Sequence, residues 1–115
     1  MDIDPIIGTW QLTSETENGA EISTECSRKN TLTFLSNGTT SEVYYYDNGN
    51  TTCDTDADSA NWENVGNSNY KVDYGDNDSQ TEKITFSENN SIFSFTSTEE
   101  FNGTTETYTG TYRKI

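Results

Sequence analysis

The sequence predicts an all-β protein, an eight-stranded antiparallel barrel of the up-and-down, or meander, kind. Short runs rich in Thr, Tyr, Phe, Val and Ile alternate with turn signals along the chain. Asn-Gly pairs, which supply the positive φ values that tight hairpins require, occur at 18–19, 37–38, 48–49 and 102–103. Several runs place apolar residues at every second position, so each expected strand has one dry face and one wet face.

Turn signals divide the chain into eight expected strands. These strands cover residues 8–17, 28–36, 39–47, 60–65, 69–75, 82–87, 91–100 and 104–114. A short helical turn is expected near 20–25, and the polar segment 47–59 is expected to be a long connection. Because short loops join most consecutive strands, neighbours in sequence should be neighbours in the sheet, and closure into a barrel removes exposed edges. A two-sheet sandwich is the alternative architecture.

Length and composition favour one small domain whose interior is built from aromatic rings. The chain has 115 residues, of which 29% are hydrophobic, and these include seven Tyr, five Phe and two Trp. A chain of this length forms a single core, and rings bury the most apolar area per residue. We expect residues 1–7 to be an N-terminal tail, left after removal of a leader or lipid anchor, and 8–115 to be one monomeric domain.

The charge of the chain excludes several kinds of partner. Twenty acidic residues against six basic ones give a formal net charge of −14. Nucleic acid and anionic membrane surfaces both select cationic proteins, so neither is an expected partner. No apolar run reaches the roughly 20 residues that a transmembrane helix needs, and we expect no transmembrane segment.

Five elements of the chain, taken in order, resemble a known family. Gly8-Thr9-Trp10 opens the first expected strand, one Cys precedes the second strand, a Thr-Leu-Thr-Phe to Asn-Gly-Thr hairpin covers 31–39, a second Cys follows the third strand, and Tyr-Thr-Gly-Thr-Tyr-Arg-Lys ends the chain at 108–114. This series is similar to that of the lipocalin-like domains of small exported lipoproteins from Bacteroidetes-type bacteria. The resemblance implies a lipocalin or calycin barrel and a non-enzymatic role in the cell envelope. The chain departs from the wider lipocalin pattern because it has no Thr-Asp-Tyr triplet.

Barrel closure predicts a contact between the two ends of the chain. In a closed meander the first strand lies beside the last, which brings Trp10 close to Arg113. The resemblance implies that a basic side chain covers the Trp at the closed end, as a cation–π contact of roughly 0.5 to 2 kcal/mol. The alternative is a buried Trp10 and a solvated Arg113, and in either case the pair is structural.

Two cysteines, Cys26 and Cys53, are expected to form a disulfide. An even pair in a small chain of this kind is more simply a bridge than a metal site, with two free thiols as the alternative. Hairpin register places Cys26 opposite Asn50, a few residues from Cys53. A bridge implies an oxidising, extracytoplasmic compartment.

The residues give no support to catalysis or to a cofactor. The chain contains no histidine, which removes the usual general base, the usual zinc ligand and every Ser-His or Cys-His arrangement. Asp54, Asp56 and Asp58 have the spacing that begins a calcium loop, but Ser59 and Val65 stand where that loop needs Gly and Glu. They are weak metal candidates, and a solvated acidic loop is the favoured interpretation.

The barrel interior is therefore the candidate site. The residues expected to point inward are Trp10, Leu12, Phe34, Tyr45, Trp62, Tyr74, Phe86, Phe95 and Tyr108. Eight strands are just wide enough to be filled by side chains or to hold one small ligand. We expect the domain to bind a small hydrophobic or amphipathic molecule. The alternative is a structural domain with a filled core that contacts a protein or glycan.

Overall fold

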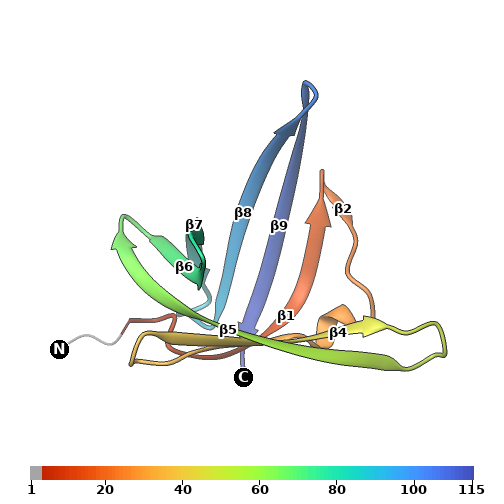
Figure 1. The fold of residues 1–115 in the computed structure, drawn as a ribbon, viewed down its shortest axis with the longest axis horizontal. Coiled ribbons are helices and arrows are strands. Elements are labelled where there is room, and N and C mark those ends of the chain that lie inside the picture. Colours follow the sequence, from red (N-terminus) through yellow and green to blue (C-terminus); the bar gives the residue numbers. More distant parts are fainter. Residues whose placement is uncertain (1–3) are drawn as a thin grey trace.

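A computed structural model describes residues 4–115 and confirms the closed antiparallel barrel (Figure 1). The elements, in chain order, are β1 (Gly8–Glu17), β2 (Ala20–Glu21), the 3-10 helix η1 (Ser27–Lys29), β3 (Thr31–Phe34), β4 (Thr39–Asp47), β5 (Cys53–Gly66), β6 (Asn69–Gly75), β7 (Asp78–Ser87), β8 (Ile92–Phe101) and β9 (Thr104–Lys114). Eight strands, β1 and β3 to β9, follow one another around the barrel, and pairing of β9 with β1 closes it. Strand β2 is a short addition to the free edge of β1.

Four expected strands, 8–17, 39–47, 69–75 and 104–114, coincide with β1, β4, β6 and β9. Their ends are set by turns that demand positive φ, such as the β8–β9 hairpin, where Asn102 and Gly103 have φ of 51° and 79°. Asn and Gly adopt this conformation at the lowest cost, which is why the sequence marks these turns clearly.

The polar segment 47–59 is not a long loop, contrary to expectation. Strand β5 begins at Cys53 and runs for 14 residues, and its first nine residues pair with β4 from Asp47↔Cys53 to Thr39↔Asn61. The Asp-rich sequence hides this strand because pairing of backbone groups, not side-chain composition, holds it. The helical turn expected at 20–25 also lies elsewhere, since Ala20–Glu21 is β2 and the 3-10 helix covers Ser27–Lys29.

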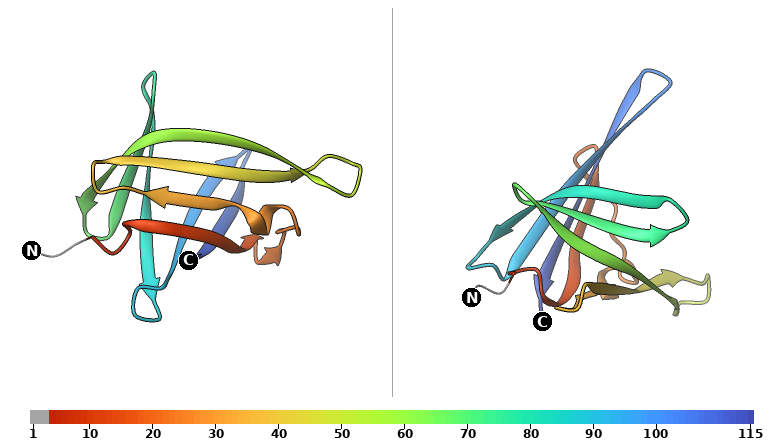
Figure 2. Two further views of the ribbon diagram at one scale, coloured as in Figure 1. Left: turned by 90° about the horizontal axis from the view of Figure 1, so that it is seen from below. Right: turned by 60° about the vertical axis from the view of Figure 1, so that its left-hand side comes forward.

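Two short seams hold one end of the barrel together while the other end opens. Strand β1 pairs with β3 only over Gly8–Gln11, and β7 pairs with β8 only over Ile84–Ser87. Beyond these seams the β6–β7 ribbon separates from the β8–β9 ribbon, and β1, which stays paired with β9, separates from β3, as Figures 1 and 2 show. The barrel therefore has a sealed end, near the start of β1, and a wide open end.

A β-bulge in β1 decides which of its residues face inward. The register with β9 shifts between Leu12 and Ser14, so that Leu12 lies opposite Tyr112 and Glu15 lies opposite Gly110. Inserting one residue on one strand exchanges its inner and outer faces beyond the bulge. Trp10 and Leu12 consequently point into the sealed end, whereas Glu15 points into the open half.

The core fills the sealed end with rings. Its buried residues are Ile6, Trp10, Leu12, Phe34, Tyr70, Ile84, Phe93 and Tyr112, with Leu32, Trp62, Phe86 and Phe95 packed against them. The ring of Trp10 meets that of Phe93 edge-on at 4.7 Å, and Phe93 stacks on Tyr112 at 4.9 Å. Such ring pairs add to the free energy gained from burial alone.

The N-terminal segment belongs to this core, and the expected tail over 1–7 is wrong for Asp4–Ile7. Ile6 is 0% exposed, and its carbonyl accepts a hydrogen bond of 2.8 Å from the Trp10 indole N–H. The Asp4 carboxylate accepts hydrogen bonds from the Tyr70 hydroxyl at 2.7 Å and from the Asn64 amide at 2.9 Å. These contacts hold the segment across the sealed end of the barrel. The rest of the expected tail, residues 1–3, lies outside the described residues.

The basic partner of Trp10 is Lys114, not Arg113. In the β1–β9 ladder Trp10 lies opposite Lys114 while Gln11 lies opposite Arg113. Since neighbouring residues of a strand point to opposite faces, Arg113 is directed outward and is exposed. The Lys114 ammonium lies 5.2 Å from the centre of the Trp10 ring, so the contact exists one residue further along than predicted.

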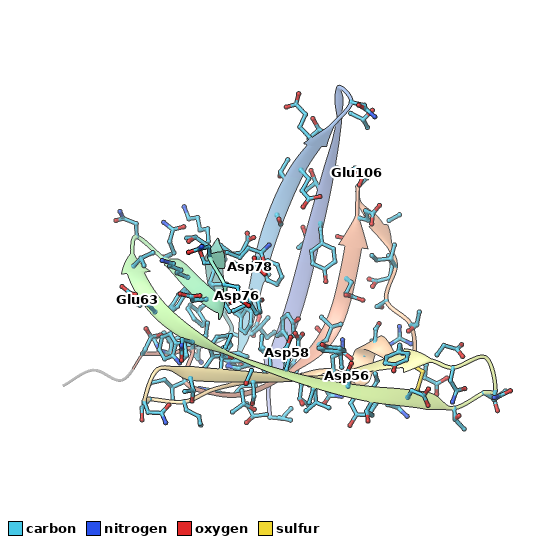
Figure 3. All side chains as sticks on the ribbon, in the orientation of Figure 1. Asp56, Asp58, Glu63, Asp76, Asp78 and Glu106 are labelled. Atoms are coloured by element: carbon cyan, nitrogen blue, oxygen red, sulfur yellow. A yellow bond between two sulfur atoms is a disulfide. The ribbon has the colours of Figure 1, made fainter. Side chains whose placement is uncertain are left out.

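Cys26 and Cys53 are joined in a disulfide, as expected. The bridge links the connection between β2 and η1 to the first residue of β5, far from the sealed end, and Figure 3 shows it as a yellow bond near the tip of the β4–β5 ribbon. The bridge ties the β4–β5 ribbon to the segment that precedes β3, in the region where β1 and β3 no longer pair.

We expect the substitution Ile6→Ala to destabilise the fold by about 2 to 5 kcal/mol, because it empties a fully buried site in the core. The matched control is Ile22→Ala, at a position that is 43% exposed, and it should cost less than about 1 kcal/mol. Urea denaturation followed by fluorescence measures both. Equal costs for the two variants would show that residues 4–7 are a tail.

Reduction of the disulfide, or the double variant Cys26→Ser and Cys53→Ser, should lower the free energy of unfolding by about 3.5 kcal/mol. The bridge closes a loop of 27 residues, and this figure is the entropy lost by the unfolded chain on closing such a loop. Thermal unfolding with and without a phosphine reductant measures the effect. An unchanged melting temperature would contradict the expected role of the bridge.

Candidate functional site

A cavity of about 270 Å³ lies inside the barrel, above the ring-filled core. Its floor is apolar and is formed by side chains from the sealed half, namely Ile6, Leu32, Phe34, Tyr70, Val72, Ile84, Phe93 and Tyr112. Phe95 and Tyr108 extend this apolar surface along the β8–β9 ribbon, with their rings 5.8 Å apart. A small molecule entering from the open end would therefore meet a ring-lined floor.

The upper wall of the cavity is acidic. Glu15 of β1, Glu42 of β4, Asp58 of β5 and Glu82 of β7 line it, and among the described residues no Lys or Arg does. Strand pairing brings two of these carboxylates together, because Glu42 lies directly opposite Asp58. Figure 3 shows Asp58 together with further carboxylates, namely Asp56 on β5, Asp76 and Asp78 at the β6–β7 ribbon and Glu106 on β9.

Hydrogen bonds occupy some polar groups of the cavity and leave others open. Tyr108 donates to Glu15 at 2.6 Å, and the Thr40 hydroxyl donates to the Thr33 carbonyl at 2.8 Å. Tyr112 is only 5% exposed, and the described residues offer its hydroxyl no hydrogen bond. That oxygen is nevertheless not enclosed by protein atoms, so it opens onto the cavity that Tyr112 lines.

Burial and like charge shift the pKa values of the wall in one direction. Burial raises the pKa of Glu42, and the neighbouring charges of Asp58 and Glu15 raise it further. Burial also raises the pKa of Glu82, although a hydrogen bond from Ser97 opposes the rise. The pKa of Tyr112 rises well above its ordinary value through burial first and through the Glu42 charge next.

The structure separates the residues that were predicted to point inward into three groups. Phe34, Tyr74, Phe95 and Tyr108 line the cavity. The remaining interior residues, Trp10, Leu12, Trp62 and Phe86, belong to or pack against the core below it. Tyr45 is a correction, since Thr40 and Glu42 face inward and strand alternation places Tyr45 on the outer face of β4.

Sequence reasoning missed three of the four carboxylates of the wall, Glu15, Glu42 and Glu82, and it named Asp58 only as a weak metal candidate. Glu42 follows Thr40 at a spacing of two, so the register of β4 alone identifies it once the buried face of that strand is known. Three consecutive tyrosines, Tyr44 to Tyr46, obscured that face. The alternation of residues along β1 could not show that Glu15 faces inward, because the bulge exchanges the inner and outer faces of β1 just before this residue.

The weak metal candidates Asp54, Asp56 and Asp58 lie in strand β5, not in a loop. They share one face and lie opposite Tyr46, Tyr44 and Glu42. Alternate residues of a strand are roughly 6.5 to 7 Å apart, so an extended backbone does not wrap them around one ion as a calcium loop does. In the part of the chain that the structure describes, no three acidic or cysteine side chains are grouped to hold a metal ion.

A second hollow, of about 320 Å³, continues from the cavity along the inner side of the β8–β9 ribbon. Its lining is polar and includes Glu17, Ser97, Glu99 and Glu106, and it shares Gln80, Phe95 and Tyr108 with the main cavity. It therefore forms an acidic approach to the apolar floor.

Comparison with known proteins supports the barrel architecture. The sequence profile of the lipocalin-like domain family matches residues 6–92, well over half of the chain. The chain belongs to the family of lipocalin-like domains. Among curated proteins, a search finds no match to this lipocalin-like domain.

A solved lipocalin shares the fold of this lipocalin-like domain. The crystal structure of the possum milk whey lipocalin trichosurin, determined at pH 4.6 with bound 4-ethylphenol, aligns with a TM-score of 0.54 at 14% sequence identity. The alignment covers 92% of this chain and 73% of trichosurin. At this identity the likeness shows the fold alone. Among residues 4–115, the structure contains no helix of the length and apolarity needed to cross a membrane.

We expect Glu42→Gln to raise the melting temperature at neutral pH by a few degrees, since about 1 kcal/mol corresponds to roughly 4 °C in a domain of this size. A raised pKa in the folded state means that ionised Glu42 opposes folding. Protonation of Glu42 stabilises the folded state fully at pH values below 4.5, the pKa of this group in the unfolded chain. This stabilisation is lost as the pH rises through the higher pKa of the folded state.

The difference between Glu42→Gln and the parent should therefore disappear at pH values well below 4.5. Glu63→Gln, on the exposed outer face of β5, is the matched control and should change the melting temperature little. Differential scanning calorimetry across this pH range checks the expectation. A loss of stability in Glu42→Gln at neutral pH would contradict it.

Proposed function

We propose that this lipocalin-like domain is a non-enzymatic binding protein that takes one small hydrophobic or amphipathic molecule into its barrel. The observation that carries the proposal is the cavity of about 270 Å³, open to solvent above a floor of buried rings. A mostly apolar pocket with a few placed polar groups is the usual form of a small-molecule site. The Tyr112 hydroxyl and the carboxylates of the wall are the polar groups here.

The size of the cavity suits a small ligand of about one ring. Pockets for drug-sized ligands span roughly 300 to 1,000 Å³, and this cavity lies just below that range. Rings and aliphatic side chains pack in the sealed end, which removes depth that a long acyl chain would require. The related barrel of trichosurin was crystallised with 4-ethylphenol, a one-ring compound of suitable size to test.

The proposed location is extracytoplasmic, in a protein exported as a lipoprotein. The Cys26–Cys53 bridge supports export, because disulfides persist in oxidising compartments. The chain has no histidine for acid-base or nucleophilic catalysis, and the acidic wall stands above an apolar, ring-lined floor. A binding role fits this arrangement better than a reaction, and it requires no cofactor.

The test of the proposed function is binding of 4-ethylphenol, measured by calorimetry or by perturbation of protein NMR signals. A Kd of roughly 10 µM to 1 mM is expected for a ligand of about nine non-hydrogen atoms. Ala60→Trp should weaken this binding by about tenfold or more, because Ala60 lines the cavity and an indole there occupies its space.

The matched control is Ala57→Trp, which places the same side chain on the exposed outer face of the same strand. It should leave the Kd of 4-ethylphenol unchanged. Equal weakening by the two tryptophans would place the bound molecule outside the cavity. Absence of binding by 4-ethylphenol and by every other one-ring compound tried would contradict the proposed function and favour a structural domain.

A further inference from the structure

We propose that the ligand of this cavity is an organic cation, a protonated amine attached to a small apolar body. This inference rests on the proposed function and narrows it to one chemical class. The apolar body would lie on the ring-lined floor, and the ammonium group would lie between the Tyr112 hydroxyl and the carboxylates of Glu42 and its neighbours.

The charge of the cavity supports a cationic ligand. Its wall carries the four acidic side chains Glu15, Glu42, Asp58 and Glu82, each from a different strand, and no described basic residue lines it. The chain has only six basic residues, and one of them, Lys114, is held at the sealed end over Trp10. The protein therefore supplies no cation of its own to balance these carboxylates. Low dielectric in a partly enclosed cavity strengthens their attraction for a positive ligand.

An unused hydrogen-bonding group provides an independent indication. The Tyr112 side chain lines the cavity and is only 5% exposed, and its hydroxyl has no hydrogen-bond partner among the described residues, which leaves its oxygen free to accept a hydrogen bond from a bound molecule. Glu42 and Tyr112 both line the cavity, so the two groups face the same space. An ammonium group has three donors and is able to bond to the Tyr112 oxygen and to a carboxylate at once.

The spacing of the carboxylates favours an organic cation over a metal ion. Within residues 4–115 no three acidic side chains converge on one point. Metal ions need several oxygen ligands at about 2 to 2.6 Å, whereas an alkylammonium ion requires only a negative field and one or two acceptors. The apolar floor directly below the carboxylates supplies no ligand atoms to a metal ion, but it fits the hydrocarbon part of an amine.

The experiment compares three compounds that share one ring and differ in charge. They are neutral 4-ethylphenol, cationic 4-(2-aminoethyl)phenol and anionic 3-(4-hydroxyphenyl)propanoate, and calorimetry at neutral pH and low ionic strength measures each Kd. The amine should bind roughly tenfold or more tightly than 4-ethylphenol, since hydrogen bonds to charged groups are the stronger ones. The anion should bind more weakly than the neutral compound.

Three variants test whether the named carboxylate and hydroxyl are responsible. Glu42→Gln should reduce the preference for the amine over 4-ethylphenol by about threefold or more, because it removes one charge from the cavity wall. Glu63→Gln removes the same charge from the exposed outer face and should leave the preference intact. Tyr112→Phe should also reduce the preference, since it removes the acceptor that the structure leaves open.

The outcomes separate this inference from the proposed function. If 4-ethylphenol binds in the cavity as tightly as the amine, the domain binds small molecules but does not select cations, and the inference is wrong. Tighter binding of the anion than of the amine would also overturn it. If none of the three compounds binds, the proposed function itself fails.

Discussion

Strand β1 pairs along both of its edges at the start of the domain, and the rest of the molecule depends on this double pairing. Over four residues it is bonded to β3 on one side, and from Trp10 onward it is bonded to β9 on the other. The ladder closes the sheet at the point where Trp10, Ile6 and Phe93 meet. Eight strands thus enclose a core although less than a third of the residues are hydrophobic. Rings compensate for the small number of apolar residues because each one buries a large area.

Short seams at the sealed end have a consequence at the other end. Because β1 leaves β3 after Gln11 and β8 leaves β7 after Phe95, the ribbons separate above the core (Figure 2). The space between them is too wide for the remaining side chains to fill, and a cavity results. The disulfide limits this separation on the β4–β5 side, where backbone pairing to β1 has ended.

Much of the fold could be predicted from the sequence, because turn chemistry and alternation are local signals. Asn-Gly turns mark ends of β1, β4 and β9, other turn residues with positive φ flank β6, and apolar residues at every second position identify Phe34 and Phe95 as inward-facing. The first half of β5 could not be predicted in this way, since its acidic side chains resemble a loop and only its partner strand specifies it. A shift of one residue gave Arg113 the place that Lys114 occupies, because register is a property of the pair of strands.

The acidic wall escaped prediction for a related reason. Net charge suggested solubility, which is a property of the surface, but strand register directs four of the carboxylates toward the cavity. The bulge at residues 12–14 and the pairing of Glu42 with Asp58 are features of tertiary structure that no single strand encodes. Identifying the inward-facing residues of a barrel therefore requires the register of each strand. Residue type alone identifies only the apolar floor of the cavity.

Solution NMR provides the most direct measurement of the central claim, that β1 seals the barrel by pairing with both β3 and β9. Cross-strand nuclear Overhauser effects should connect Trp10 with Leu32 on one side and with Lys114 on the other, as the two ladders require. Contacts from β1 to only one of these strands would contradict closure. The cavity, its acidic wall and the proposed ligand would then lose their structural basis.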